Sequence, residues 1–483
     1  MGRLAALLAL GALALAAPAA AFTPTDPLSP KQWYLVQDHA FDLWPDLPAN
    51  LASVKVAVID SGIDIGHPEF AGRIFAARSF VGPPDDVTDK DGHGTCVAGE
   101  IAAAVNNGQG IAGIAFPAQL VVAKVVGSDG TISPDVEARA IRWAVAQGAR
   151  VVNLSLGGLR DPLDPRRDTY SSLEAKAVQY AASHGVVVVA AVGNGDEAPR
   201  TPWLYASYPA ALPHVLGVSA LGQDGSVPFF SNRDAIYNDL SAPGADILST
   251  FPRALTAVRP TCPDQGYSDC GSQEFRNAEG TSFAAPQVAA AAALLFSANP
   301  QLSADQVAAI LEHSAVDVTP GSGCPHCLVW RDPLSGWGRL NIAAALQALN
   351  GPLPAPDRYE ANDDAGASAW TIYGSARQIA ATLDYWDDQI DVYRVRLRNG
   401  QRISASLHGP GNTDTNLVLW KPGTRQVEGL SLKLQAQRAT QSAGQGPNEQ
   451  LAYRALAGGW YYLEVKLTTP GSGPYTLRYT KTG

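Results

Sequence analysis

The sequence predicts an α/β domain, a parallel sheet flanked by helices, followed by a small all-β sandwich. Up to residue 350, short apolar runs alternate with longer segments in which apolar residues have helical spacing. Strands that alternate with helices form parallel sheets with helices on both faces. Beyond residue 350 the pattern changes to short alternating segments separated by Asn, Asp, Gly and Pro, which is typical of a β-sandwich.

The first domain contains five apolar runs that we predict as buried strands. They are Val54–Ile59, Leu120–Val126, Val151–Leu156, Val186–Val192 and Val215–Ala220. Helices are predicted between and after them, at Asp135–Gln147, Ser172–Ser183, Thr281–Ser297 and Ser303–His313, the last with Ser303 as its N-cap. Parallel sheets of this kind place ligands and chemistry at the carboxyl ends of their strands. Polar residues directly after these strands are therefore the first candidates for a site.

The second domain follows a Pro-rich linker at residues 351–357. We expect residues 358–483 to form the sandwich. Its predicted strands are Asp391–Leu397, Arg402–Leu407, Asn416–Trp420, Trp460–Val465 and Tyr475–Tyr479.

The N-terminus is predicted to be a targeting segment. Arg3 precedes an apolar run from Leu4 to Ala17, and the small residues Ala19–Ala21 suit a signal peptidase. A membrane anchor is the alternative, but the run is shorter than the ~20 residues that span a bilayer. We therefore expect residues 1–21 to be a signal peptide and residues 22–53 to be the N-terminal segment of the mature chain, with no folded propeptide.

The composition argues against two classes of partner. The 483 residues include 45 acidic and 35 basic ones, which gives a formal charge of −10, and no long basic run occurs. Nucleic-acid binding through phosphates and attachment to anionic lipid both need clustered Lys and Arg. We expect a monomer that binds neither nucleic acid nor, after signal cleavage, a membrane.

The chain has five cysteines, and export would favour their oxidation. Local pairing would give Cys262–Cys270 and Cys324–Cys327 and leave Cys96 free, while cross-pairing between the two clusters stays open. Cys324-Pro325-His326-Cys327 also resembles a thioredoxin-type redox motif. Its Pro- and Gly-rich surroundings favour a loop staple, because the redox motif belongs at a helix start after a strand.

Three motifs carry candidate chemistry. Asp60 ends an apolar strand, His93 stands between Gly92 and Gly94, and Ser282 opens an apolar helix. Acyl transfer by serine needs a nucleophile, a base that takes its proton, and a carboxylate that holds the base in one tautomer. Each residue alone would more often be a turn, loop or cap residue, but together they supply all three parts.

The chain order Asp60, His93, Ser282, with these flanking residues, resembles the subtilisin-like serine proteases, or subtilases. The resemblance implies a subtilisin-like catalytic domain at residues 54–350. It implies that Asp60 orients the imidazole, that His93 is general base and then acid, and that Ser282 is the nucleophile. Asn194, within Val192-Gly193-Asn194-Gly195, would donate its amide to the developing oxyanion. The expected function is that of a secreted serine endopeptidase.

The resemblance also places the substrate. An extended peptide would pair with the edge segment around Ser155. The residues expected to bind it are Ile132, Ser155, Leu156, Gly157, Gly158, Ala191, Val192 and Gly193. The small walls imply a roomy apolar slot and broad specificity, with a preference for apolar residues before the scissile bond. Asp196, Glu197, Trp203 and Tyr205 are further candidates for this pocket. The sequence departs from the family at Phe283, commonly Met, and at Cys96, often His.

The tail resembles the bacterial pre-peptidase C-terminal domain, a secreted β-sandwich. The resemblance lies in Asp357–Asp364, Asp391–Val395 and Gly459–Val465. Its acidic turns, like Asp85, Asp86 and Asp89 in the first domain, either hold structural Ca²⁺ or are solvated turn acids. No catalytic cofactor is expected. The partners would be proteins or peptides, met outside the cell after passage through the periplasm.

Two other functions stay open. An inactive protease fold could serve as a binding protein whose sandwich holds a surface or polymer, or Cys324 and Cys327 could form the site of a thiol oxidoreductase. The complete set of Asp60, His93, Ser282 and Asn194 favours the peptidase.

Overall fold

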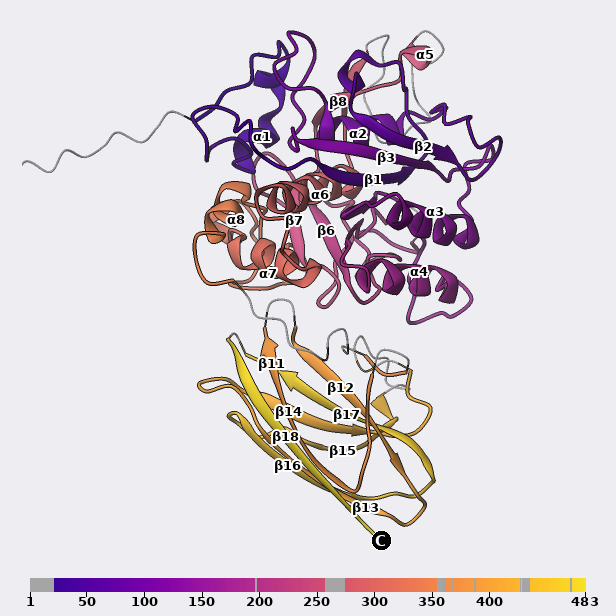
Figure 1. Ribbon diagram of the computed structural model, residues 1–483, viewed down its shortest axis with the longest axis vertical. Coiled ribbons are helices and arrows are strands. Elements are labelled where there is room, and N and C mark those ends of the chain that lie inside the picture. Colours follow the sequence, from indigo (N-terminus) through magenta and orange to yellow (C-terminus); the bar gives the residue numbers. More distant parts are fainter. Residues whose placement is uncertain are drawn as a thin grey trace, which may run out of the picture.

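The computed structural model describes residues 21–483 except residues 196–197, 257–273, 354–358, 360–361, 363, 367–368, 386–387, 426, 428–434 and 470. An α/β domain occupies the upper part of Figure 1 and a β-sandwich the lower part. The predicted fold class is confirmed.

A seven-stranded parallel sheet forms the centre of the α/β domain, with the strand order β2-β3-β1-β4-β5-β6-β7. Its strands are β1 (Val54–Asp60), β2 (Ile74–Ser79), β3 (Ala118–Lys124), β4 (Val151–Leu154), β5 (Val187–Ala191), β6 (Val215–Leu221) and β7 (Leu240–Pro243). A separate antiparallel pair is formed by β8 (Ile247–Thr250) and β9 (Phe275–Ala278). The five predicted strands are all present, because nearly every residue of their apolar runs is buried between helices.

Helices cover both faces of this sheet. One apolar core includes residues of α2 (His93–Ala102), α6 (Thr281–Ala298), α7 (Ala304–Ser314) and α8 (Ile342–Ala348), and the other includes residues of α3 (Pro134–Ala146) and α4 (Ser172–Ala182). The short helices are α1 (Trp33–Gln37), α5 (Arg253–Thr256) and the 3₁₀ turns Ser29–Lys31, Pro68–Phe70 and Pro320–Ser322. Tyr34, Leu35 and Phe41 belong to the first core, so the segment at residues 22–53 is part of this domain.

Helix α6 is apolar around its whole circumference. By length and composition it could cross a membrane, but 89% of it is buried inside the protein. A helix of this kind is the central helix of a large core. The start of α7 is defined by Ser303, whose hydroxyl accepts a hydrogen bond from the Gln306 N–H in a capping box, as predicted.

The sandwich consists of a five-stranded sheet in the order β10-β12-β17-β14-β15 and a four-stranded sheet in the order β11-β18-β13-β16. Its strands are β10 (Trp370–Ile372), β11 (Ala376–Asp384), β12 (Ile390–Leu397), β13 (Arg402–His408), β14 (Thr415–Trp420), β15 (Arg438–Ser442), β16 (Asn448–Arg454), β17 (Gly459–Leu467) and β18 (Ser472–Thr482). Alternate residues of β13 and β18 are buried, and both sheets contribute to one core. This alternation is the period of two that the sequence shows.

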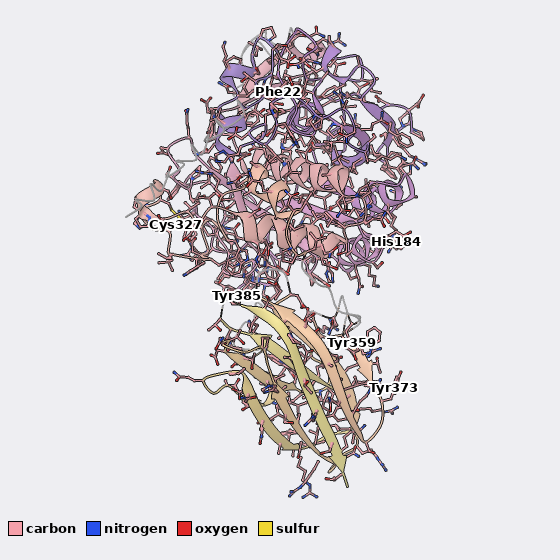
Figure 2. All side chains as sticks on the ribbon, turned by 60° about the vertical axis from the view of Figure 1, so that its left-hand side comes forward. Phe22, His184, Cys327, Tyr359, Tyr373 and Tyr385 are labelled. Atoms are coloured by element: carbon pink, nitrogen blue, oxygen red, sulfur yellow. A yellow bond between two sulfur atoms is a disulfide. The ribbon has the colours of Figure 1, made fainter. Side chains whose placement is uncertain are left out.

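The sandwich meets the α/β domain at the amino ends of β5 and β6. Tyr385 lies at this junction (Figure 2), and its ring centroid is 5.0 Å from that of Trp337. His313 Nε2 of α7 lies 3.1 Å from Asp384 Oδ1. A cavity of about 760 Å³ between the two parts is lined by residues that include Val187 and Leu216. The carboxyl ends of the sheet strands are therefore at the opposite end from the sandwich.

Candidate active site

Asp60 and His93 are brought together at the carboxyl end of β1. Asp60 is the last residue of this strand and is buried. His93 Nδ1 lies 2.9 and 3.0 Å from its two carboxylate oxygens, and Oδ1 also accepts a hydrogen bond from the Ser61 N–H. A carboxylate that accepts from Nδ1–H leaves Nε2 as the basic nitrogen of the neutral ring.

Asp89 shapes the turn that delivers His93. Its Oδ1 accepts hydrogen bonds from the Ser61 hydroxyl and from the N–H groups of Asp91 and Gly92, and its Oδ2 accepts from the N–H and hydroxyl of Thr95. Gly92 has a φ of 112°, and a Cβ there would lie 2.3 Å from the Phe251 ring. The turn therefore needs glycine, and Asp89 is neither a solvated turn acid nor a free metal ligand.

The charge of His93 is set by opposing effects. Burial lowers its pKa, but the charge and hydrogen bond of Asp60, together with the charges of Asp91 and Asp89, outweigh burial and raise the pKa to about 9. Asp91 also accepts a hydrogen bond from the His93 N–H. The imidazole is thus a stronger base than free histidine.

Ser282 lies in the first turn of α6, next to the end of β4. Its hydroxyl donates to the Ser155 carbonyl oxygen at 3.2 Å, and the Ser155 hydroxyl donates to the Ser282 carbonyl oxygen at 2.6 Å. The following residue, Phe283, is fully buried, and its ring centroid is 5.2 Å from that of His93. The contact of Phe283 with His93 brings the starts of α2 and α6 together, beside the carboxyl ends of β1 and β4.

Asn194 follows β5 and is held by Thr281. Its Oδ1 accepts hydrogen bonds from the Thr281 N–H and hydroxyl, both at 2.9 Å, and the same hydroxyl accepts from the Gly193 N–H. With Oδ1 engaged in this way, the Nδ2 hydrogens are the part of the amide left to donate into the cleft. Thr281 was not among the residues predicted from the sequence, although its place directly before Ser282 was a usable signal.

A cavity of about 180 Å³ opens beside Ser282 and Asn194. Of the residues expected to bind substrate, Leu156, Gly157, Gly158, Ala191 and Gly193 line it. Leu159, Gly195, Ala198, Ser207, Asn232 and Thr281 line it as well. A Cβ on Gly157 would lie 2.5 Å from the Tyr208 carbonyl oxygen. This glycine therefore allows a close approach of two wall segments, which differs from the expected role of widening the slot.

Other residues expected to bind substrate do not line this cavity, and Ile132 was expected at a further apolar subsite. Val192 is fully buried in the core beneath α3 and α4, and Ile132 packs against the same core. Ser155 was expected to pair with the substrate main chain, and its hydroxyl donates to the Ser282 carbonyl oxygen. Trp203 is buried and donates its indole N–H to the Arg160 carbonyl oxygen, and Tyr205 packs on its ring. Asp196 and Glu197 lie outside the described residues.

Comparison with known proteins identifies the family. The model of the subtilase family, Peptidase_S8, matches residues 52–338. The chain belongs to the subtilase family. Thermitase from Thermoactinomyces vulgaris is 33% identical over 328 residues, which cover 68% of this chain and all of that protein. Subtilisin DY from Bacillus licheniformis is 34% identical over 296 residues, 61% of this chain and 92% of that protein.

A solved structure of a protease from Pseudoalteromonas arctica PAMC 21717 covers 68% of the chain and 99% of its own length, with 28% identity and a TM-score of 0.53. The match and the named serine proteases make this subtilase a serine endopeptidase. The residues that the family model matches end at 338, before the sandwich begins.

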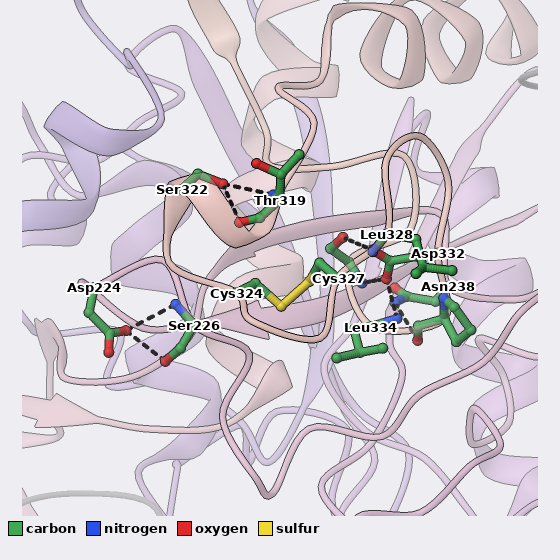
Figure 3. The surroundings of a disulfide bond; sticks show 12 residues. Asp224, Ser226, Asn238, Thr319, Ser322, Cys324, Cys327, Leu328, Asp332 and Leu334 are labelled. Carbon is green, nitrogen blue, oxygen red and sulfur yellow. Dashed lines mark hydrogen bonds between the residues drawn. A yellow bond between two sulfur atoms is a disulfide. The ribbon is translucent and has the colours of Figure 1, made fainter.

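Among the described residues of this subtilase, one disulfide staples a loop. Cys324 and Cys327 are bonded, with their Cα atoms 5.4 Å apart, and both are buried (Figure 3). Their loop follows the 3₁₀ turn at Pro320–Ser322 and is further held by Asp332, which accepts from the Leu328 N–H. Cys96 is a buried free thiol, and burial raises its pKa. Cys262 and Cys270 lie outside the described residues.

The acidic residues considered for calcium give no candidate site in the part of the chain that the structure describes. Within the described ranges, no three His, Cys, Asp or Glu side chains form a group that could hold a metal ion. Asp89 is saturated by five protein donors, and Asp86 lies 3.8 Å from the Lys90 ammonium. Of the two alternatives for the acidic turn, a Ca²⁺ site built from the carboxylates of Asp86 and Asp89 does not fit these contacts.

Proposed function

We propose that this subtilase is an exported endopeptidase that cleaves peptide bonds through an acyl-enzyme on Ser282. The proposal is supported by the Asp60–His93 hydrogen bond, by the contact of Phe283, the residue after Ser282, with the His93 ring, and by the cavity that Ser282 and Asn194 line. Ser282 Oγ would attack the scissile carbonyl carbon while its proton passes to His93 Nε2. Asp60 would hold the ring and stabilise the imidazolium that forms.

The carbonyl electrons move onto oxygen, and Asn194 Nδ2 and the Ser282 N–H would donate to this oxyanion. Collapse of the intermediate breaks the C–N bond, and His93 returns its proton to the leaving amine. Water then repeats the two steps, releasing the acid and restoring Ser282. All these groups come from the chain, so the proposal needs no catalytic cofactor.

The resting geometry suggests how substrate binding starts the reaction. The Ser282 hydroxyl donates to the Ser155 carbonyl oxygen. A substrate N–H that bonds to this oxygen would displace the hydroxyl and free it for His93. Gly158 already exchanges both main-chain hydrogen bonds with Tyr208, so pairing with the peptide would fall on the residues before Gly158.

The pocket supports broad specificity with an apolar preference. Leu156, Leu159, Ala191 and Ala198 are apolar, whereas Ser207 and Asn232 add polar groups. Proteins and peptides would be the partners of a monomeric enzyme. Export is supported by the leader pattern, and Phe22, the second described residue, is already bonded through its N–H to the Trp44 carbonyl oxygen. The tail is proposed to be a pre-peptidase C-terminal domain, in keeping with its two-sheet sandwich.

An active-site serine phosphonylating reagent tests the proposal. The purified protein should be labelled once, and Ser282→Ala should lose both the label and peptide hydrolysis. Ser297→Ala is a matched control, because this buried serine lies in the same helix; it should keep both. An inactive binding protein would not be labelled, and an oxidoreductase would lose activity on Cys324→Ser instead. Retention of the label in Ser282→Ala would refute the assignment.

A further inference from the structure

A buried ion pair lies behind the specificity pocket. Arg160 follows Leu159, a pocket residue, in the loop between β4 and α4. Its Nη1 lies 2.8 Å from Asp234 Oδ2, and the two residues are 6% and 4% exposed. Burial of such a pair costs desolvation free energy. Removal of one partner is strongly destabilising, because it leaves the other charge buried and uncompensated.

Asp234 joins segments that are far apart in the sequence. Besides Arg160, its Oδ2 accepts a hydrogen bond from the Ala206 N–H, and its Oδ1 accepts from the N–H groups of Ile236 and Tyr237. The carboxylate is therefore the meeting point of the segments at residues 159–161, 203–208 and 232–237. Each segment contributes one wall residue to the pocket, in turn Leu159, Ser207 and Asn232.

The remaining contacts of Arg160 tie the same segments together. Its carbonyl oxygen accepts from the Trp203 indole N–H, and the Trp203 carbonyl oxygen accepts from the Arg233 N–H. The guanidinium carbon lies 4.8 Å from the ring centroid of Tyr237 and 5.5 Å from that of Tyr205. All three segments are loops outside the main sheet. Two main-chain hydrogen bonds between Gly158 and Tyr208 also join the first two, so the ion pair acts on the part of the wall beyond Gly158.

We propose that Arg160 is a positioning residue that sets the width of the specificity pocket. It acts through Asp234, which draws the Leu159 wall toward the wall formed by Ser207 and Asn232. This inference rests on the proposed function, since the pocket must receive the side chain before the scissile bond. Loss of the pair lets the walls separate. Discrimination among side chains then falls, whereas the chemical step, which uses Ser282 and His93, is unaffected.

The test compares two peptide substrates that differ only in Phe or Ala before the scissile bond. Active-site titration with the phosphonylating reagent gives the concentration of folded enzyme, so that kcat and KM refer to active molecules alone. In Arg160→Met, the Phe-to-Ala ratio of kcat/KM should fall by roughly tenfold, within the range that a pocket contact controls. The change should lie in KM for the Phe peptide, with kcat for the Ala peptide within about twofold of the parent.

Three further variants sharpen the test. Arg160→Lys keeps the charge and should recover part of the ratio. Arg166→Met removes an exposed arginine of the same loop, whose partner is Asp164, and should leave the ratio unchanged. If Arg160→Met does not fold, the double variant Arg160→Met/Asp234→Met removes the pair without leaving a buried charge. Either Arg160→Met or the double variant must be active by titration. The proposal would be overturned if that active variant kept the Phe-to-Ala ratio of kcat/KM of the parent. Failure of the proposed function would appear differently, as a parent enzyme without phosphonylation or hydrolysis.

Discussion

The two ends of the central sheet each carry a His–Asp pair, and the pairs differ in their surroundings. At the carboxyl end, His93 and Asp60 are 2.9 Å apart, and their side chains are 17% and 3% exposed. At the amino end, His313 and Asp384 are 3.1 Å apart and 37% and 19% exposed. The distances are nearly equal, so distance alone does not distinguish a candidate base from a contact between domains.

The two histidines also lie at opposite ends of their helices. His93 is the first residue of α2, where the helix dipole disfavours a cation, and His313 is in the last turn of α7, where the dipole favours one. His93 nevertheless has its pKa raised to about 9, because buried Asp60 and nearby Asp91 and Asp89 outweigh burial. The charges of the neighbouring carboxylates, in a region of low dielectric, therefore shift the pKa of His93 more than the helix dipole does.

The largest expected effect is that of Asp60→Asn. The amide would leave the His93 imidazole in the wrong tautomer, and kcat should fall by about 10⁴. Steady-state hydrolysis of a chromogenic peptide measures it. Asp384→Asn is the matched control at the other end of the sheet and should change kcat by less than about twofold. A kcat of Asp60→Asn within tenfold of the parent would contradict the assigned difference between the two pairs.

The next effect is that of Asn194→Ala. Removal of one oxyanion donor costs about 10²–10³ in kcat, and KM should stay close to that of the parent. Thr281→Val should also lower kcat, but less. Asn194 would lose the hydrogen bond from the Thr281 hydroxyl and keep the one from the Thr281 N–H. Single-turnover acylation separates the chemical step from binding. A rise in KM at constant kcat would instead assign Asn194 to substrate binding.

The third prediction concerns pH. The base must be neutral, and with a pKa of about 9 only about one imidazole in a hundred is neutral at pH 7. Activity should therefore rise through about pH 9, well above the ~6.5 of free histidine. Asp91→Asn removes one charge that raises this pKa, so the midpoint of kcat/KM should move to lower pH. A parent profile with its midpoint near 6.5 would show that the carboxylates do not act in this way.

The same shift has a consequence for stability. A pKa raised in the folded state stabilises the protein below the unfolded value of ~6.5 and loses this contribution as the pH rises through about 9. The free energy of unfolding should therefore fall less between pH 6.5 and 9 in His93→Ala than in the parent.

The smallest expected effect is that of His313→Ala. Partly exposed ion pairs contribute about 0–1 kcal/mol, so the thermal midpoint should fall by no more than ~4 °C. Calorimetry and peptide hydrolysis on the same sample measure both properties. A tenfold loss of kcat would show that the contact with the sandwich is coupled to the cleft. The two ends of the sheet would then not act independently.

The sequence predicted those features that have a local pattern. Long apolar runs mark β1 and β5 because strands buried on both faces cannot alternate. Strand β2 was missed because it is half exposed, and β7 because it has four residues and ends in Pro243. Val192 was expected to line the pocket, but it follows the end of β5 and is buried in the core with α3 and α4, whereas Ala191, the last residue of the strand, lines the cavity.

The candidate site shows the same limit. Asp60, His93 and Ser282 each stand at a strand end or helix start with a recognisable flanking sequence. Ser207 and Asn232 reach the pocket from loops, and no periodicity marks them; only the fold brings them to the Val192 carbonyl oxygen, which accepts from the Ser207 N–H and from Asn232 Nδ2. The raised pKa of His93 results from the balance between burial and the nearby charges of Asp60, Asp91 and Asp89, and residue types alone could not predict this balance.

The contact between Phe283 and His93 also bears on resistance to oxidants. A thioether beside the nucleophile would be converted by peroxide into a polar sulfoxide, but a phenyl ring undergoes no such reaction under mild conditions. Met1 is the only methionine of the chain, and it would be removed with the leader. Cys96 is shielded from solvent, and burial keeps it in the less reactive thiol form. The cleft should therefore keep its chemistry in bleaching solutions that damage proteases with methionine at this position.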